Sequence, residues 1–392
     1  MDDFRDSIAN ALRSRPGTRP QFFNVAVESS RSEMRALLTD SVIGVSDDYR
    51  EQQRELFAIR NPALAHLREF DAQFDAYYED LGNAAEGGRW VYFPWSGALS
   101  HILDEGDFFT VRTARNRNLI TEDEQRKFYG AHVGLAGLSV GSSVAFALAL
   151  GGGAKRMRLA DMDTLSLSNT NRVLSSVTEL GEHKVNMAAR RIYEINPYAE
   201  VETMPEGLTE KNIGNFFEGL DIVVDEVDNL AVKYLLRREA KRRRIPIVMA
   251  ADNGDGVVID IERYDLDHDL PFFHGRLGDL GYEELKKMDK INIGRTITRH
   301  IGAENVTPRM QESLLEIGKS LVSWPQLGGA AMLAGAAVAY CVRRIVSGEP
   351  LESNRALVSF DEMLIPGYDA PSARDKRAEE GHAFAKRFGI SV

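Results

Sequence analysis

The stretch His132–Leu150 reads HVGLAGLSVGSSVAFALAL and predicts a strand, a glycine-rich turn and a helix in succession. The apolar run over residues 132–136 is typical of a buried strand, and residues 141–150 have the length and content of a buried helix. Glycines let the backbone approach a ligand closely, and the N–H groups at a helix N-terminus attract anions. The stretch therefore predicts either a phosphate-binding turn or a close-packed turn without a ligand.

The spacing within this turn is irregular. Ending a dinucleotide-type G-x-G-x-x-G pattern on Gly141 places Ala136 and Leu138 at its first two glycine positions. Gly137, Ser139 and Gly141 also have the spacing of a nucleophile elbow, but no Asp and His follow in a supporting arrangement. We therefore expect Ser139 to bind a phosphate or to cap the helix.

Strand-like and helix-like runs alternate after this stretch, which predicts βαβ units and a mostly parallel sheet. The expected strands are residues 157–160, 201–204, 220–224 and 245–250, and the expected helices are 184–195 and 232–243. The fold class expected is therefore α/β, with a Rossmann-like sheet flanked by helices.

The remaining segments predict a mainly helical N-terminal region and a C-terminal α+β extension. The first contains a helical spacing of apolar residues, which we expect to pack in a core. It also contains an aromatic run, Arg89–Trp95, that could be a short strand or a clamp against the next unit. The apolar residues are Leu67, Phe70, Phe74 and Tyr77. The C-terminal segment contains expected helices over 311–322 and 329–346, a strand over 356–360 and a charged surface helix. The domains expected are residues 1–114, 115–265 and 266–392.

Composition limits the kind of protein. The 392 residues carry a net charge of −11 and one cysteine, Cys341. An acidic chain gains nothing from the general attraction to nucleic-acid phosphates, so nucleic acid is an unlikely partner. One cysteine forms no internal disulfide and no four-cysteine zinc site, which fits a reducing compartment. The first fourteen residues lack a leader pattern, and the apolar run Gly328–Val342 is shorter than a membrane span, so we expect a cytoplasmic protein.

Polar side chains follow the expected strands, and their types favour nucleotidyl transfer over hydride transfer. Asp161 follows the second strand of the region, 20 residues after Gly141, where a carboxylate can bind ribose hydroxyls. That much suits a nicotinamide or an adenine nucleotide. The further polar residues are Asp163, Asn169, Arg172, Lys184, Asp225, Asp228 and Asn229. Hydride transfer does not need this set, whereas nucleotidyl transfer needs cations for the phosphates and a carboxylate for Mg²⁺.

These phrases resemble the ThiF/MoeB-type adenylyltransferases, which share a fold with the adenylylating domains of ubiquitin-activating enzymes. The matching phrases are the glycine turn, DMDTLSLSNTNR, GEHKV, INP, DIVVDEVDN and IPIVMAA, in the family's order. They cover residues 115–260, and more loosely 324–348. The resemblance implies that Asp161 binds the ribose and that Asn169, Arg172 and Lys184 bind phosphates. It also implies Mg²⁺ at Asp228, braced by Asn229.

The resemblance further implies a homodimer, because the family uses an arginine from the partner subunit. Arg117 occupies the corresponding phrase, with Arg115 as a second choice. The chain departs from the family in having neither CxxC pair, so we expect no structural zinc. The loop expected to carry a thioester-forming cysteine has none. Cys341 lies in an apolar helix pattern typical of a buried, inert thiol.

The function expected is Mg²⁺- and ATP-dependent adenylylation of a carboxylate, without a thioester step. The carboxylate could belong to a peptide, a ubiquitin-like protein or a small acid, and the N-terminal region could select it. An NAD(P)-dependent oxidoreductase and a catalytically silent scaffold remain as alternatives.

Two other clusters have less specific patterns. A loop with Asp267, His268, Asp269, His274 and Asp279 matches no tight metal-ligand spacing and suggests a polar loop over the active site, with acid–base work by its histidines as an alternative. The basic run Arg237–Arg244 suggests the solvated face of a helix, with docking of an acidic partner or RNA as an alternative.

Overall fold

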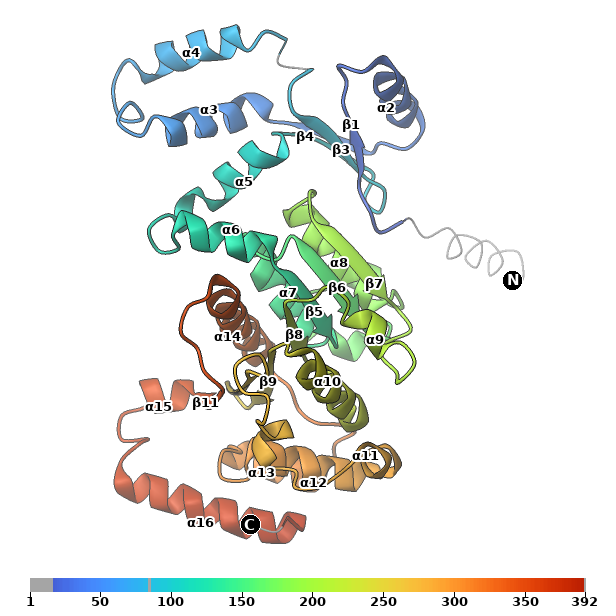
Figure 1. The fold of residues 1–392 in the computed structure, drawn as a ribbon, viewed down its shortest axis with the longest axis vertical. Helices are drawn as coiled ribbons and strands as arrows, with labels where there is room; N and C mark the ends of the chain where they lie inside the picture. The colour runs from blue at the N-terminus through green and yellow to red at the C-terminus, as the bar shows by residue number, and fades with distance from the viewer. Residues whose placement is uncertain (1–16, 84–85, 391–392) are drawn as a thin grey trace, which may run out of the picture. The chain divides into compact units, whose positions relative to one another are not determined.

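The computed structural model describes residues 17–83 and 86–390 and divides into two compact units (Figure 1). The first, called the N-terminal unit, comprises residues 1–122 with 189–199, and the second, called the sheet unit, comprises 123–188 with 200–392. The opening fourteen residues, read above as lacking a leader, lie outside the described part of the chain.

The N-terminal unit contains helices and a four-stranded sheet. Its strands have the order β1-β3-β4-β2 and are β1 (Gln21–Phe23), β2 (Gly44–Asp47), β3 (Arg89–Phe93) and β4 (Ala98–Ile102). Its helices are α2 (Glu28–Asp40), α3 (Tyr49–Arg60), α4 (Phe70–Asp80) and α5 (Glu105–Thr113). Only β3 was expected from the sequence, because strands of three to five residues are too short to show a period.

The expected apolar core of this region is confirmed in part. Phe70 and Phe74 are buried in α4, and Tyr77 is half-buried. All three rings lie against the ring of Phe57. The prediction for Leu67 is wrong: this side chain is 53% exposed because it precedes the first residue of α4.

The sheet unit contains a seven-stranded sheet of order β11-β10-β9-β8-β5-β6-β7. The strands are β5 (His132–Ala136), β6 (Arg156–Ala160), β7 (Glu200–Met204), β8 (Ile222–Asp225), β9 (Ile247–Asn253), β10 (Gly256–Glu262) and β11 (Asn354–Val358). The five from β5 to β9 are parallel, and β10 and β11 add antiparallel pairs at one edge. The expected α/β, Rossmann-like class is confirmed.

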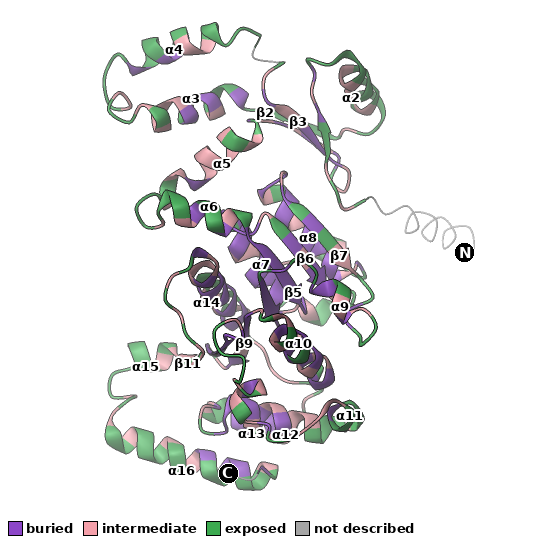
Figure 2. Cartoon of the chain, viewed as in Figure 1, coloured by how far each residue is buried: buried purple, intermediate pink, exposed green. Residues whose placement is uncertain are grey.

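Helices lie on both faces of this sheet, with α7 and α14 on one side and α9 and α10 on the other (Figure 1). The helices from residue 122 onward are α6 (Glu122–Gly130), α7 (Gly141–Leu150), α8 (Lys184–Ile195), α9 (Ile213–Phe216), α10 (Leu230–Arg243), α11 (Tyr282–Lys287), α12 (Lys290–Ile301), α13 (Pro308–Glu316), α14 (Gly328–Ser347), α15 (Phe360–Leu364) and α16 (Pro371–Phe388). Helix α8 is divided between the two units, because residues 189–199 belong to the N-terminal unit. Burial concentrates on the central strands and the helix faces against them (Figure 2). The sheet therefore holds the core of this unit.

Helix α14 is longer than the sequence analysis expected. With 20 residues it is long and apolar enough to cross a membrane by length and composition alone, which corrects the statement that this run is too short. It nevertheless packs against α7, β9 and β10. A Cβ added at Gly335 would lie 2.7 Å from the backbone of Ser143, so the glycine permits close packing of α14 on α7. These contacts explain the glycine and alanine content of the run as packing within the sheet unit.

Candidate nucleotide site

The glycine turn joins β5 to α7 at the carboxyl edge of the parallel strands. Ala136 is paired with both Ala160 and Asp225, so the loops that follow β5, β6 and β8 leave the sheet side by side. Gly137 has φ +86°, and a Cβ there would lie 2.4 Å from the carbonyl oxygen of Glu226. The turn thus requires glycine at 137, because it passes so close to the loop after β8.

Gly141 is different, because its backbone angles are ordinary and an added Cβ would have only normal contacts at 3.5 Å or more. It begins α7, whose first N–H groups have no acceptor within the helix. Helix N-termini of this kind stabilise negative charge. The geometry of the turn is compatible with the phosphate-binding interpretation, which stays a prediction.

Asp161 connects the glycine turn to the segment after β6. Its Oδ2 accepts a hydrogen bond from the N–H of Leu138 at 2.6 Å, and its Oδ1 accepts one from the N–H of Asp163 at 2.8 Å. Burial raises the pKa of this carboxyl, and the charge of Lys184 opposes the rise. Asp161 is therefore held against the glycine turn, and its role as a ribose ligand stays a prediction that suits either nucleotide.

Arg172 reaches the glycine turn from the segment after β6. Its Nε donates to Ser139 Oγ at 3.0 Å, and its Nη1 donates to Asn171 Oδ1 at 2.9 Å. Asn169 lies in the same segment, but its Oδ1 caps a short 3-10 helix by accepting hydrogen bonds from the N–H and the hydroxyl of Ser166. Only the amide nitrogen of Asn169 therefore has the right chemistry to bind a phosphate oxygen.

Lys184, the first residue of α8, is 6% exposed, and its Nζ lies 2.9 Å from Asp163 Oδ2. Its backbone N–H also donates to the carbonyl oxygen of Asp163 at 3.0 Å. The structure therefore brings these two predicted residues together. Asp163 holds the ammonium group in place.

Asp228 and Asn229 lie in the loop between β8 and α10. Asn229 is the N-cap of α10, and its Oδ1 accepts from the N–H groups of Ala231 and Val232 at 2.9 and 3.2 Å. This cap fixes the start of the helix next to Asp228, whose side chain is exposed. Asp228 is thus well placed to bind a cation from solvent.

Asp252 is a site residue that sequence reasoning missed. It lies near the carboxyl end of β9, is 7% exposed, and its Oδ2 accepts a hydrogen bond from Gln326 Nε2 at 3.2 Å. Burial raises the pKa of this carboxyl to about 6; the charge of Arg172 lowers it and that of Asp228 raises it. The sequence offered one signal for Asp252: it follows the expected strand 245–250. The strand extends to Asn253 in the structure, which places Asp252 within β9.

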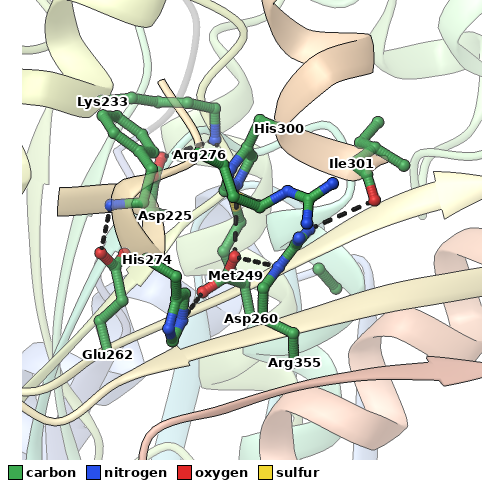
Figure 3. Close-up of polar contacts among 12 residues, drawn as sticks. Asp225, Lys233, Met249, Asp260, Glu262, His274, Arg276, His300, Ile301 and Arg355 are labelled. Atoms are coloured by element: carbon green, nitrogen blue, oxygen red, sulfur yellow. Dashed lines mark hydrogen bonds and ion pairs between the residues drawn. The ribbon is translucent and has the colours of Figure 1, made fainter. Parts of the chain in front are cut away.

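A network of buried charges lies behind the loop that carries Asp228. Asp225 at the end of β8 is fully buried and lies 2.6 Å from Arg237 and 3.1 Å from Lys233, both of α10. Arg237 also lies 2.7 Å from Glu262. Asp225, Lys233 and Glu262 appear with the second half of the network in Figure 3. The burial of Arg237 corrects the interpretation of its basic run as a uniformly solvated helix face.

The second half of the network explains His274, which was predicted to lie in a polar loop over the site. His274 Nε2 lies 2.7 Å from Asp260 Oδ1, and Arg355 Nε donates to Asp260 Oδ2 at 3.0 Å (Figure 3). Burial alone would raise the pKa of Asp260, but the hydrogen bond from His274 and the nearby His300 lower it to about 2. His274 thus fastens its loop to β10.

No metal centre forms at the loop that contains His268 and His274. Throughout residues 17–83 and 86–390, no group of three or more His, Cys, Asp or Glu side chains is placed to hold a metal ion by itself. Mg²⁺ bound together with a nucleotide needs only one or two carboxylates, because the phosphates and water supply the other oxygens. The exposed Asp228 and the buried Asp252 fit that requirement.

Two other predicted residues lie outside this cluster. Cys341 is buried in α14, as expected, and burial raises the pKa of its thiol to about 11, which disfavours the reactive thiolate. Arg115 and Arg117 belong to the N-terminal unit, and both side chains are exposed. Arg115 lies in the short 3-10 helix Ala114–Asn116, and Arg117 directly follows it. The arginine finger therefore stays a prediction.

Three comparisons with known proteins show what the chain is similar to. The ThiF family profile matches residues 113–379. The uncharacterized protein MT1398 of Mycobacterium tuberculosis is 39% identical over 71% of this chain and 39% of that protein. The tRNA threonylcarbamoyladenosine dehydratase of Bacillus subtilis is 34% identical over 34% of this chain and 54% of that protein. The molybdopterin-synthase adenylyltransferase of Haemophilus influenzae is 34% identical over 30% of this chain and 48% of that protein.

The matches therefore span about half, or less, of the length of these curated relatives. Among solved structures, Escherichia coli MccB with ATP aligns with a TM-score of 0.45 at 20% identity, covering 67% of this chain and 77% of that one. The family profile covers well over half of the chain, and it includes the glycine turn, Asp161, Arg172, Lys184 and Asp228. The chain belongs to the ThiF family.

Proposed function

We propose that this protein uses Mg·ATP to adenylylate a carboxylate in the cytoplasm, releasing pyrophosphate. The observation that carries the proposal is the gathering of the glycine turn, Arg172, Lys184 and Asp228 at the carboxyl ends of the parallel strands. Ligands of open α/β sheets bind at this edge. Cations and a metal-binding carboxylate together suit a triphosphate better than they suit a nicotinamide.

In the proposed reaction, a carboxylate oxygen of the substrate attacks the α-phosphorus of ATP. The bond from that phosphorus to the bridging oxygen breaks, pyrophosphate leaves, and an acyl-AMP forms. A carboxylate is a poor electrophile, and the mixed anhydride is a good one. The protein contributes positioning and charge stabilisation rather than covalent catalysis.

Each part of the site has a role in this proposal. Asp161 binds the ribose while its two backbone hydrogen bonds hold it against the turn. Arg172, Lys184 and the amide nitrogen of Asn169 bind the phosphates. Bound Mg²⁺ would neutralise phosphate charge at Asp228, and the Asn229 cap keeps the loop in place. The buried Cys341 leaves the acyl-AMP to be used directly by a nucleophile other than a thiol of this site.

The identity of the carboxylate is the open part of the proposal. A peptide or protein C-terminus and a small acid both fit the chemistry, and one relative is named a sulfur carrier protein adenylyltransferase. Three bacterial relatives are named tRNA threonylcarbamoyladenosine dehydratases. A substrate screen should therefore include tRNA, although the acidic net charge argued against general nucleic-acid binding.

The test is ATP–pyrophosphate exchange on the full-length protein with separate pools of peptides, carrier proteins, small acids and tRNA. We expect exchange that depends on one pool and is lost in Asp228→Ala, with Asp255→Ala, an exposed acid beyond β9, as the matched control. No exchange with any pool, together with saturable binding of NADH, would favour the oxidoreductase. Retained Mg·ATP binding without exchange would favour a silent scaffold.

We also propose that the protein is a homodimer in which Arg117 of one subunit completes the site of the other. Its exposure beside the short 3-10 helix leaves the guanidinium accessible to a partner. Mixed Arg117→Ala and Asp228→Ala subunits should regain part of the exchange activity, because some of the shared sites would carry both wild-type residues. A mixture as inactive as its parents would argue for a site within one chain.

A further inference from the structure

A buried carboxylate with an unused oxygen lies beside the proposed nucleotide site. Asp252 lies on β9, which pairs in parallel with β8, the strand that leads into the loop of Asp228. The Asp252 side chain is more than nine-tenths buried. Asp252 is therefore a second acidic group at the same sheet edge as Asp228.

The hydrogen bonds of Asp252 account for only half of its carboxylate. Oδ2 accepts from Gln326 Nε2 at 3.2 Å, whereas Oδ1 is buried and has no hydrogen-bond partner. A buried carboxylate oxygen without a partner costs free energy comparable to a lost hydrogen bond to a charged group. A purely structural role, fastening the segment before α14, would need Oδ2 alone.

The surrounding charges favour a cation. Besides burial and the hydrogen bond from Gln326, the groups that act on the pKa of the Asp252 carboxyl are the guanidinium of Arg172 and the carboxylate of Asp228. Arg172 is already bonded to Ser139 and Asn171, so it does not fill the free oxygen. Two carboxylates that repel each other at the edge of a phosphate site are stabilised by a divalent cation, and Mg²⁺ takes one or two carboxylates together with phosphate oxygens.

We propose that Asp252 is a second carboxylate ligand, with Asp228, of the Mg²⁺ that accompanies ATP. In this arrangement Gln326 orients Asp252 through Oδ2 and leaves Oδ1 to the metal. The inference rests on the proposed function, since it assumes that the phosphates of ATP supply the remaining oxygens. It adds a ligand from β9 to a site that would otherwise depend on the exposed loop of Asp228.

The first test is a Mn²⁺ titration, followed by electron paramagnetic resonance, of the full-length protein saturated with a non-hydrolysable ATP analogue. Asp252→Asn keeps the shape of the side chain and removes its charge. We expect this variant to weaken Mn²⁺ binding about tenfold or more, the loss typical when a ligand or its supporting partner is removed. The matched control Asp255→Asn, at the exposed tip of the same hairpin, should bind Mn²⁺ as the wild type does.

Two readouts separate a metal ligand from a structural residue. Affinity for the nucleotide without metal should not fall in Asp252→Asn, because the loss of a negative charge does not weaken the binding of phosphates. Equal losses with and without Mn²⁺ would therefore overturn the proposal. Mn²⁺ binding like that of the control would overturn it as well. If the wild type binds no nucleotide at all, the proposed function fails together with the inference.

The second test uses the wild-type protein and does not depend on the folding of a variant. Fe²⁺ in place of Mg²⁺, with ascorbate and peroxide, cleaves the backbone near the bound metal. With the ATP analogue present, we expect cuts beside both Asp228 and Asp252, suppressed by excess Mg²⁺. Cuts beside Asp228 alone would overturn the assignment of Asp252.

Discussion

Replacing Arg237 with leucine should strongly destabilise the sheet unit. The guanidinium is fully buried and lies 2.6 Å from Asp225 and 2.7 Å from Glu262, with its charge 3.9 Å from the centre of the Phe273 ring. After the change, Asp225 keeps Lys233, but Glu262 keeps only neutral donors, the hydroxyl of Tyr264 and the N–H of Phe273. Removing one partner of a buried ion pair costs about 3–5 kcal/mol.

The lower end of that range is expected at neutral pH. Burial already raises the pKa of Glu262, so this carboxyl can take up a proton once Arg237 is gone and avoid remaining as an unpaired charge. Urea unfolding followed by far-UV circular dichroism should show a loss of about 3 kcal/mol. Adding Glu262→Gln to Arg237→Leu should recover part of it, because no buried charge is then left without a partner.

The control is Arg238→Leu, at the next position of α10. Arg238 is exposed and lies 3.4 Å from an exposed Glu210, so its loss should cost less than about 1 kcal/mol. If Arg237→Leu cost no more than the control, the buried network would not stabilise the fold, and its account here would be wrong.

Three further changes test separate parts of the account. Gly137→Ala should abolish nucleotide binding, because its Cβ would lie 2.4 Å from the carbonyl oxygen of Glu226. Gly141→Ala should bind the nucleotide normally, because its Cβ would have only ordinary contacts. Equal effects of the two changes in a fluorescent-ATP titration would refute the turn geometry. Burial lowers the pKa of the His300 imidazole from its ordinary 6.5 to about 3. As the pH falls below 6.5, His300 is therefore protonated in the unfolded chain but not in the folded one, and the free energy of unfolding decreases. Between pH 7 and 5 this loss should be about 2 kcal/mol larger in the wild type than in His300→Leu, by urea midpoints, and parallel curves would refute it. Cys341→Ser should keep pyrophosphate exchange, since the thiol is buried, and loss of exchange in a folded variant would revive a thiol intermediate.

The sheet unit was largely predictable because its elements are long and strongly patterned. The bounds expected for α7 and α8 agree with the structure, and each expected strand of the parallel sheet is present within a few residues. Strands buried on both faces are continuous apolar runs, which differ clearly from the polar loops between them. The polar segments that follow the strands, in the order typical of the family, then indicated which strand ends carry the candidate site.

The network of charges was not predictable, because it depends on contacts between distant segments. Arg237 belongs to a basic run whose local pattern is that of an exposed helix face, yet it pairs with a carboxylate from β8 and another from β10. Likewise, Asp252 lies beyond the end of the predicted strand, and its burial depends on packing that the sequence does not display. The sequence pattern around a residue therefore predicts its exposure correctly only where no segment distant in the sequence packs over that residue.

The nature of the bond broken in ATP tests the central claim most directly. The full-length protein would be given α-³²P-ATP, Mg²⁺ and a carboxylate pool that supports exchange, with the carboxylate oxygens labelled with ¹⁸O. The account predicts AMP and pyrophosphate, with one ¹⁸O transferred to AMP when the acyl group is released to a nucleophile. Formation of ADP and phosphate, or AMP without the label, would contradict adenylylation of a carboxylate.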